Sequence, residues 1–79
     1  MKELKELKDL FAKLHIQSIQ NPNDTSIRFA LGNTAMKLGM TETAIDWYKA
    51  TLGMDPNHVG ARQQLSQIMT QPSVLKPIP

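Results

Sequence analysis

The fold of this chain is decided by the stretch Asn21-Pro-Asn-Asp-Thr-Ser-Ile-Arg-Phe-Ala-Leu31, which is repeated 34 residues later as Asp55-Pro-Asn-His-Val-Gly-Ala-Arg-Gln-Gln-Leu65. Proline, asparagine, arginine and leucine recur in register, and an aspartate replaces the first asparagine. A fixed period of this length is typical of proteins built from stacked structural repeats. Such repeats mostly present a surface to a partner, so the pattern favours a binding function over catalysis.

The length and composition predict one small domain with a limited core. The chain has 79 residues, no cysteine and a formal net charge of +2. A chain this short buries only about 60% of its unfolded surface, and no disulfide or thiolate metal site can add stability. We therefore expect help from a partner or from self-association. The positive charge is too weak to predict nucleic-acid binding, which we keep only as an unlikely alternative.

No part of the sequence is predicted to enter a membrane or to direct export. The N-terminal segment is charged, and no apolar run approaches the length of a signal peptide or a membrane-spanning helix. We expect a cytoplasmic protein that does not contact membranes.

Helical periodicity predicts four helices, at about residues 2–20, 25–38, 41–53 and 57–70, and no strand. Gly39 is expected to end the second helix in a left-handed conformation, and Thr41 to cap the third. Asp55 and His58 lie in the turn before the fourth helix, where capping explains both residues. Three prolines among residues 72–79 predict an extended C-terminal tail.

The residues between the two copies resemble the tetratricopeptide repeat (TPR), a unit of 34 residues with the pattern W-x₂-L-G-x₂-Y…A-x₃-F…P. The matching residues are the pair Leu31-Gly32, Ala44, Tyr48 and the closing Asp55-Pro56, with Gly39 at the turn. Arg28 and Ala35 depart from the pattern at two of its aromatic positions. The resemblance implies an all-α fold in which antiparallel helix-turn-helix pairs form a right-handed stack of four helices.

The resemblance also implies a domain organisation. Residues 1–71 form a single TPR-like domain, and residues 72–79 form a proline-rich tail. Within the domain, residues 1–20 are an N-terminal helix, residues 25–58 a full repeat and residues 59–70 a C-terminal capping helix. Because about three repeats are normally needed for a stable array, one repeat with two flanking helices is expected to associate, most simply as a homodimer.

Six residues are candidates for binding a protein or peptide partner. In TPR arrays the first helix of each unit lines a concave groove, and the corresponding residues here are Phe29, Asn33, Met36 and Lys37 in the second helix and Gln63 and Gln67 in the fourth. An aromatic ring and a methionine flanking an amide suit peptide binding. Alternatively, Phe29 packs in the core and the glutamines form a solvated face.

The first helix carries a second apolar patch, formed by Ala12, Ile16 and Ile19, well away from its leucine stripe. A surface helix of a globular protein needs only one apolar face. The patch is expected to be covered, either by another part of this chain or by another chain. We favour another chain, and assign these three residues to self-association.

No catalytic, cofactor or metal site is predicted. His15 and His58 lie in different segments without a second ligand at helical spacing, and no phosphate-binding loop or nucleophile motif is present. The sequence therefore predicts an interaction protein, such as an adaptor or assembly factor, that is not an enzyme. The alternative is a self-assembling scaffold subunit whose unpaired end units stack on one another. Arg28 and Arg62 share one place in the two copies, where they either bind an acidic partner or pack their stems over neighbouring helices.

Overall fold

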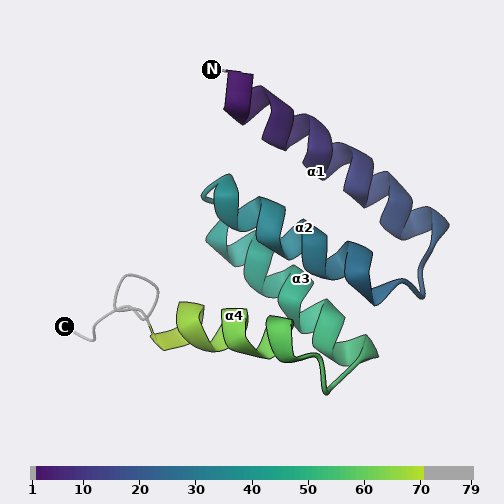
Figure 1. Cartoon of the computed structure of the whole chain (residues 1–79), viewed down its shortest axis with the longest axis vertical. Coiled ribbons are helices and arrows are strands. Elements are labelled where there is room, and N and C mark those ends of the chain that lie inside the picture. Colours follow the sequence, from purple (N-terminus) through teal and green to yellow (C-terminus); the bar gives the residue numbers. More distant parts are fainter. Residues whose placement is uncertain (1, 71–79) are drawn as a thin grey trace.

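Within residues 2–70, which are the part of the chain that the computed structural model describes, the protein is all-helical and has no strand. The helices are α1 (Lys2–Gln20), α2 (Thr25–Lys37), α3 (Thr41–Met54) and α4 (Val59–Thr70) (Figure 1). The prediction of four helices is confirmed. The expected extended tail, residues 72–79, lies outside the described residues.

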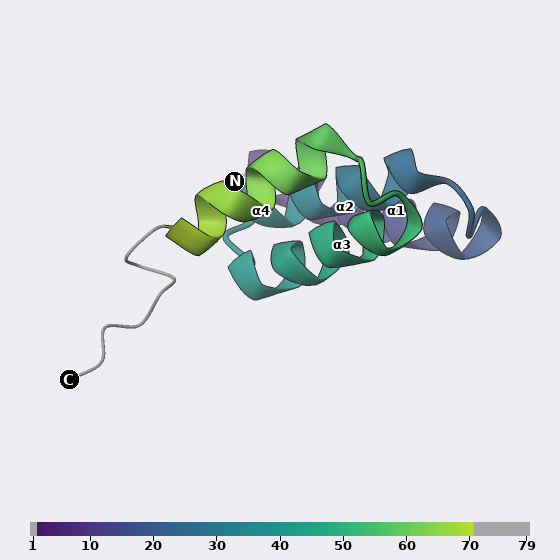
Figure 2. The same cartoon turned by 90° about the horizontal axis from the view of Figure 1, so that it is seen from below.

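The chain turns back at each of its three connections, so that each helix packs against the helix before it (Figures 1 and 2). The most extensive packing joins α2 to α3, and smaller contacts join α1 to α2 and α3 to α4. As a result, α1 and α4 lie on opposite sides of the central α2–α3 pair (Figure 1). Each of these two outer helices has one face that no described helix covers.

The ends of α2 are set by the residue types that the sequence places there. The side chain of Asp24 accepts a hydrogen bond from the backbone N–H of Ser26 at 3.0 Å and caps the first turn. Gly39 has a φ of 76°, a left-handed conformation that favours glycine, which confirms its predicted role after the helix. Thr41 was expected to cap α3 but is its first residue, and Met40 takes the cap position without a side-chain hydrogen bond.

The turn before α4 contains two side-chain caps. Asp55 Oδ1 accepts from the backbone N–H of Asn57 at 3.2 Å, and His58 Nδ1 accepts from the backbone N–H of Ala61 at 3.0 Å. The prediction that capping explains both Asp55 and His58 is confirmed. Because His58 serves as the cap, α4 begins at Val59, two residues later than the sequence predicted.

The core lies between α2 and α3 and continues onto α4. Its buried apolar residues are Leu31, Ala35, Ala44, Tyr48, Ala61 and Ile68. Small residues allow the helices to approach closely: a Cβ atom added at Gly32 would lie 2.5 Å from Cε1 of Tyr48. Glycine at this position lets the tyrosine ring lie directly against the backbone of α2.

Within residues 2–70, no helix combines the length and the apolar character needed to cross a lipid bilayer.

Candidate functional site

The face of α2 that was predicted to bind a partner is largely occupied by α3 and the turn before α4. Asn33 Oδ1 accepts a hydrogen bond from the Tyr48 hydroxyl at 2.7 Å. The Phe29 ring lies 5.9 Å from the Tyr48 ring and 4.7 Å from the His58 ring, measured between centroids. Met36 is partly buried against the same core. Packing in the core, the alternative given for Phe29, therefore describes this residue, and the Asn33 side chain is held by Tyr48.

The other three predicted partner-binding residues are exposed. Lys37 lies at the end of α2, and Gln63 and Gln67 lie one turn apart on α4. The structure thus divides the six candidates into a packed group on α2 and a free group on α2 and α4. Only the free group can form hydrogen bonds with a partner without rearrangement of the core.

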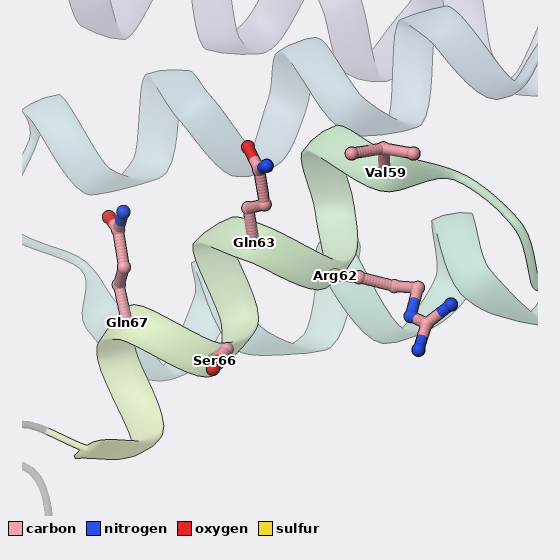
Figure 3. Close-up of a pocket in the computed structure, with 5 residues that line it drawn as sticks. All are labelled: Val59, Arg62, Gln63, Ser66 and Gln67. Atoms are coloured by element: carbon pink, nitrogen blue, oxygen red, sulfur yellow. The ribbon is translucent and has the colours of Figure 1, made fainter.

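Gln63 and Gln67 belong to an open depression of about 670 Å³ on α4, which is lined by Val59, Arg62, Gln63, Ser66 and Gln67. We call it the α4 depression. In Figure 3, Gln63 and Gln67 project from one side of the helix and Arg62 from another. The surface offers amide, hydroxyl and guanidinium groups beside Val59, whose side chain is 64% exposed. These groups can donate to or accept from the backbone or side chains of a docked polypeptide.

Val59 and Ser66 were not predicted to be parts of a site. A signal for Ser66 was nevertheless present, because the 34-residue offset continues past the quoted stretch. Ser66 then stands where Gly32 stands in the first copy, and Gln67 stands where Asn33 stands. The second pair preserves a side-chain amide at the position where Asn33 binds Tyr48, whereas Ser66 adds a small side chain at the position of Gly32.

The second candidate surface is the patch of Ala12, Ile16 and Ile19, which we call the α1 outer patch. All three residues are exposed, with 56% of Ile16 and 68% of Ile19 accessible to solvent. The partly buried side chains Phe11 and Leu14 lie on the other side of the helix. Within residues 2–70, no other segment covers the patch, so the described part of the chain does not supply the partner that the second apolar face requires.

The two histidines have structural surroundings. The His15 ring packs edge-on against Trp47, with centroids 5.8 Å apart and an angle of 73° between the planes. His58 caps α4, as described above. Among the described residues, no group of three or more histidine, cysteine, aspartate or glutamate side chains is arranged to hold a metal ion.

The two arginines at equivalent places have different environments. Arg28 is half-buried: its Nη2 donates to the carbonyl oxygen of Pro22 at 3.2 Å, while its Nε is buried without a partner. Of the two alternatives given for these arginines, binding of an acidic partner or packing of the side-chain stem, the second describes Arg28. Arg62 is exposed in the α4 depression and free to contact a partner.

Tyr48 is the buried polar group with the clearest electrostatic consequence. Burial raises the pKa of its hydroxyl above the ordinary value of a tyrosine, because desolvation disfavours the phenolate. The hydroxyl therefore remains a hydrogen-bond donor to Asn33 through the neutral pH range.

No family model, curated protein or solved structure matches this chain. The resemblance to the tetratricopeptide repeat therefore rests on the residues themselves.

Proposed function

We propose that this chain is a protein-interaction module, a small cytoplasmic adaptor or assembly factor with a right-handed, antiparallel TPR-like stack, and that it works as a homodimer. The observation that carries the proposal is the α1 outer patch, an apolar surface on a helix whose other face is already packed. Exposed apolar surface on a small folded domain marks an interaction site when its members are contiguous. Ile16 and Ile19 lie about one turn apart on α1 and are more than half exposed.

Burial of the α1 outer patch would stabilise a dimer substantially. Full burial of one isoleucine side chain is worth about 1.5–3 kcal/mol, and a two-fold symmetric contact buries two such residues from each copy. A core as small as the one formed by α2, α3 and α4 gains proportionally more from this contribution than a large domain would.

The exposed part of the predicted groove supports binding of a further protein or peptide. Lys37, Gln63 and Gln67 leave their polar groups in solvent, and glutamine amides can pair with the backbone of an extended segment. Phe29, Asn33 and Met36 make contacts within the chain instead and are not proposed to contact the partner directly.

The proposal is tested by sedimentation velocity on the full chain and on the double variant Ile16→Glu/Ile19→Glu. The wild-type chain is expected to sediment at micromolar concentration as a species heavier than its monomer mass of 8.9 kDa. The double variant is expected to associate at least about tenfold more weakly, because losing 1.4 kcal/mol of contact energy already gives that factor.

Lys49→Glu is the matched control, because it changes the net charge by the same amount at an exposed position of α3. It should associate as the wild-type chain does. Equal weakening in the control, or no weakening in the double variant, would show that the α1 outer patch is not the interface.

A further inference from the structure

The packing of α3 on α2 shows how the second helix of a helix-turn-helix unit contacts the first helix in this chain. The ring of Tyr48 lies against Gly32, and its hydroxyl donates to Asn33 at 2.7 Å. Ala44, one turn earlier on α3, is fully buried on the same side. The contact thus combines a small residue and an amide on α2 with Ala44 and Tyr48 on α3.

The α4 depression is the same surface one repeat later. Its residues Val59, Arg62, Gln63, Ser66 and Gln67 are each 34 positions after Thr25, Arg28, Phe29, Gly32 and Asn33. On α2 the part of this surface at Gly32 and Asn33 is covered by Tyr48 of α3, and Phe29 packs against Tyr48 and His58, whereas on α4 the surface is open (Figure 3). Ser66 is small but carries the Cβ that Gly32 lacks, and the residue that would face it, Leu14 at the place of Tyr48, has no aromatic ring. Gln67 retains an amide acceptor. Within residues 2–70, α4 is therefore placed as a first helix on which no second helix is packed.

At the other end of the molecule, α1 shows the complementary situation. An open depression of about 230 Å³, the α1 depression, is lined by Glu6, Asp9, Leu10 and Lys13. These residues are each 34 positions before Met40, Thr43, Ala44 and Trp47 of α3. Ala44 is fully buried, but Leu10 in the same place is 43% exposed. Within residues 2–70, α1 is therefore placed as a second helix on which no first helix is packed.

We propose that the occupant of the α4 depression is α1 of a second copy of this chain, docked as α3 docks on α2. The copies then join head to tail, and each junction completes one repeat. Leu14 stands at the place of Tyr48 and would lie over Ser66 of the neighbouring copy. This contact uses none of the α1 outer patch and is independent of the proposed dimer.

Charge and geometry favour a second copy as the occupant. The α1 depression contains Glu6, Asp9 and Lys13 and so has an acidic excess of one charge, while the α4 depression contains Arg62 and no acidic residue, so the two surfaces carry net charges of opposite sign. The two helices lie at opposite ends of the molecule (Figure 1), which allows both ends to be used at once. Such a heterologous contact produces a ring if it closes and a filament if it does not. Gln63 replaces Phe29 in the α4 depression, so the contact is less apolar than the intramolecular one and should depend on concentration.

The contact is tested by mixing two blocked variants, each of which can no longer associate through one of its two ends. Both variants also carry Ile16→Glu/Ile19→Glu as the background, so that the α1 outer patch does not contribute. Ser66→Trp fills the α4 depression, and Leu10→Glu places a charge in the α1 depression. Each residue is exposed in the single chain, so both variants should retain the helix content of the background. Ser26→Trp, at an exposed serine on α2, is the control for the added indole.

The background chain and the Ser26→Trp control are expected to show masses that rise with concentration, and each blocked variant to remain monomeric. Mixed in equal amounts, the two blocked variants should form a species of two chains and grow no further, because each retains the end that the other lacks. Arg62→Glu and the pair Glu6→Lys/Asp9→Lys provide a second blocked variant for each end. If one member of the first pair loses helix content, the charge variant of the same end replaces it in the mixture and should give the same complementation. The two charge variants are not mixed with each other, because their reversed charges are again complementary.

Three outcomes would overturn the head-to-tail contact. The background chain could be monomeric at every concentration, Ser66→Trp could associate as strongly as Ser26→Trp, or the mixture of blocked variants could remain monomeric. The first of these would leave the proposed dimer through the α1 outer patch intact. Conversely, if Ile16→Glu/Ile19→Glu associates as the wild type does while Ser66→Trp abolishes association, the dimer proposal fails and the head-to-tail contact is supported.

Discussion

At the scale of single residues, the contact between Gly32 and Tyr48 determines how closely α2 and α3 approach. The Tyr48 ring is fully buried and its hydroxyl is held by Asn33, so the ring cannot move aside when the space in front of it is filled. In contrast, a Cβ atom added at Gly53 on α3 would meet nothing within 4 Å. The two glycines therefore have opposite roles in stability.

We predict that Gly32→Ala lowers the free energy of unfolding by about 1–3 kcal/mol through overpacking against Tyr48. Gly53→Ala is the matched control, and it should leave stability unchanged or raise it by about 0.5–1 kcal/mol, because alanine is the better helix former. Urea denaturation followed by circular dichroism measures both changes. Equal effects from the two substitutions would mean that the close approach at Gly32 does not exist.

Tyr48 should also make stability depend on alkaline pH. Its pKa is raised in the folded chain, while the unfolded chain ionises near the ordinary tyrosine value of about 10. The stabilising contribution is therefore complete below about pH 10 and is lost as the pH rises through the folded pKa. We predict that Tyr48→Phe weakens this alkaline loss of stability.

The measurement for Tyr48 is the free energy of unfolding of both chains between neutral and strongly alkaline pH. Tyr48→Phe should be less stable than the wild type at neutral pH by about 0.5–1.5 kcal/mol, because it lacks the hydrogen bond to Asn33. The difference should shrink as the pH rises above 10. A constant difference across the whole range would contradict a raised pKa for Tyr48.

At the scale of the helices, the sequence predicted the number of helices and most of their ends, because proline, glycine and the capping residues act locally. The left-handed Gly39 and the caps at Asp55 and His58 are examples. It did not predict which side of α2 remains exposed. A helical wheel gives the angles between side chains but not the number of neighbouring helices, and α2 has one on each side. Phe29 and Asn33 were assigned to the groove for this reason.

The position of Phe29 leads to a prediction about stability. Phe29→Ala should destabilise the chain, because it removes ring contacts with Tyr48 and His58. Leu31→Ala, at a fully buried position, should cost about 2–5 kcal/mol. Thermal denaturation compares the two variants. An unchanged melting curve for Phe29→Ala would return this residue to the partner-binding surface.

The candidate surfaces were predictable to different degrees. Periodicity alone located the α1 outer patch, because Ile16 and Ile19 lie far around the helix from the leucine stripe. The α4 depression could be identified only from the structure. Tyr48 packs on Gly32, whereas no described residue packs in the same way on the equivalent surface at Ser66. A sequence repeat shows that two positions are equivalent, but the structure shows that one of them is covered and the other is open.

At the scale of the whole molecule, the two outer helices of residues 2–70 are each packed against another helix on one side only. The central helices α2 and α3 pack most extensively on each other, whereas α1 and α4 each retain an open face at opposite ends of the described part of the chain (Figures 1 and 2). The α1 outer patch adds a third surface suited to association. Protein association through these surfaces is the central claim about this chain, and it concerns the intact protein rather than any single residue.

The measurement that tests this claim most directly is the mass of the wild-type chain in solution across a dilution series, with helix content recorded on the same samples. The expected result is a helical protein whose mass at micromolar concentration exceeds 8.9 kDa and rises with concentration. A fully helical species that stays at 8.9 kDa from the lowest to the highest concentration would contradict it.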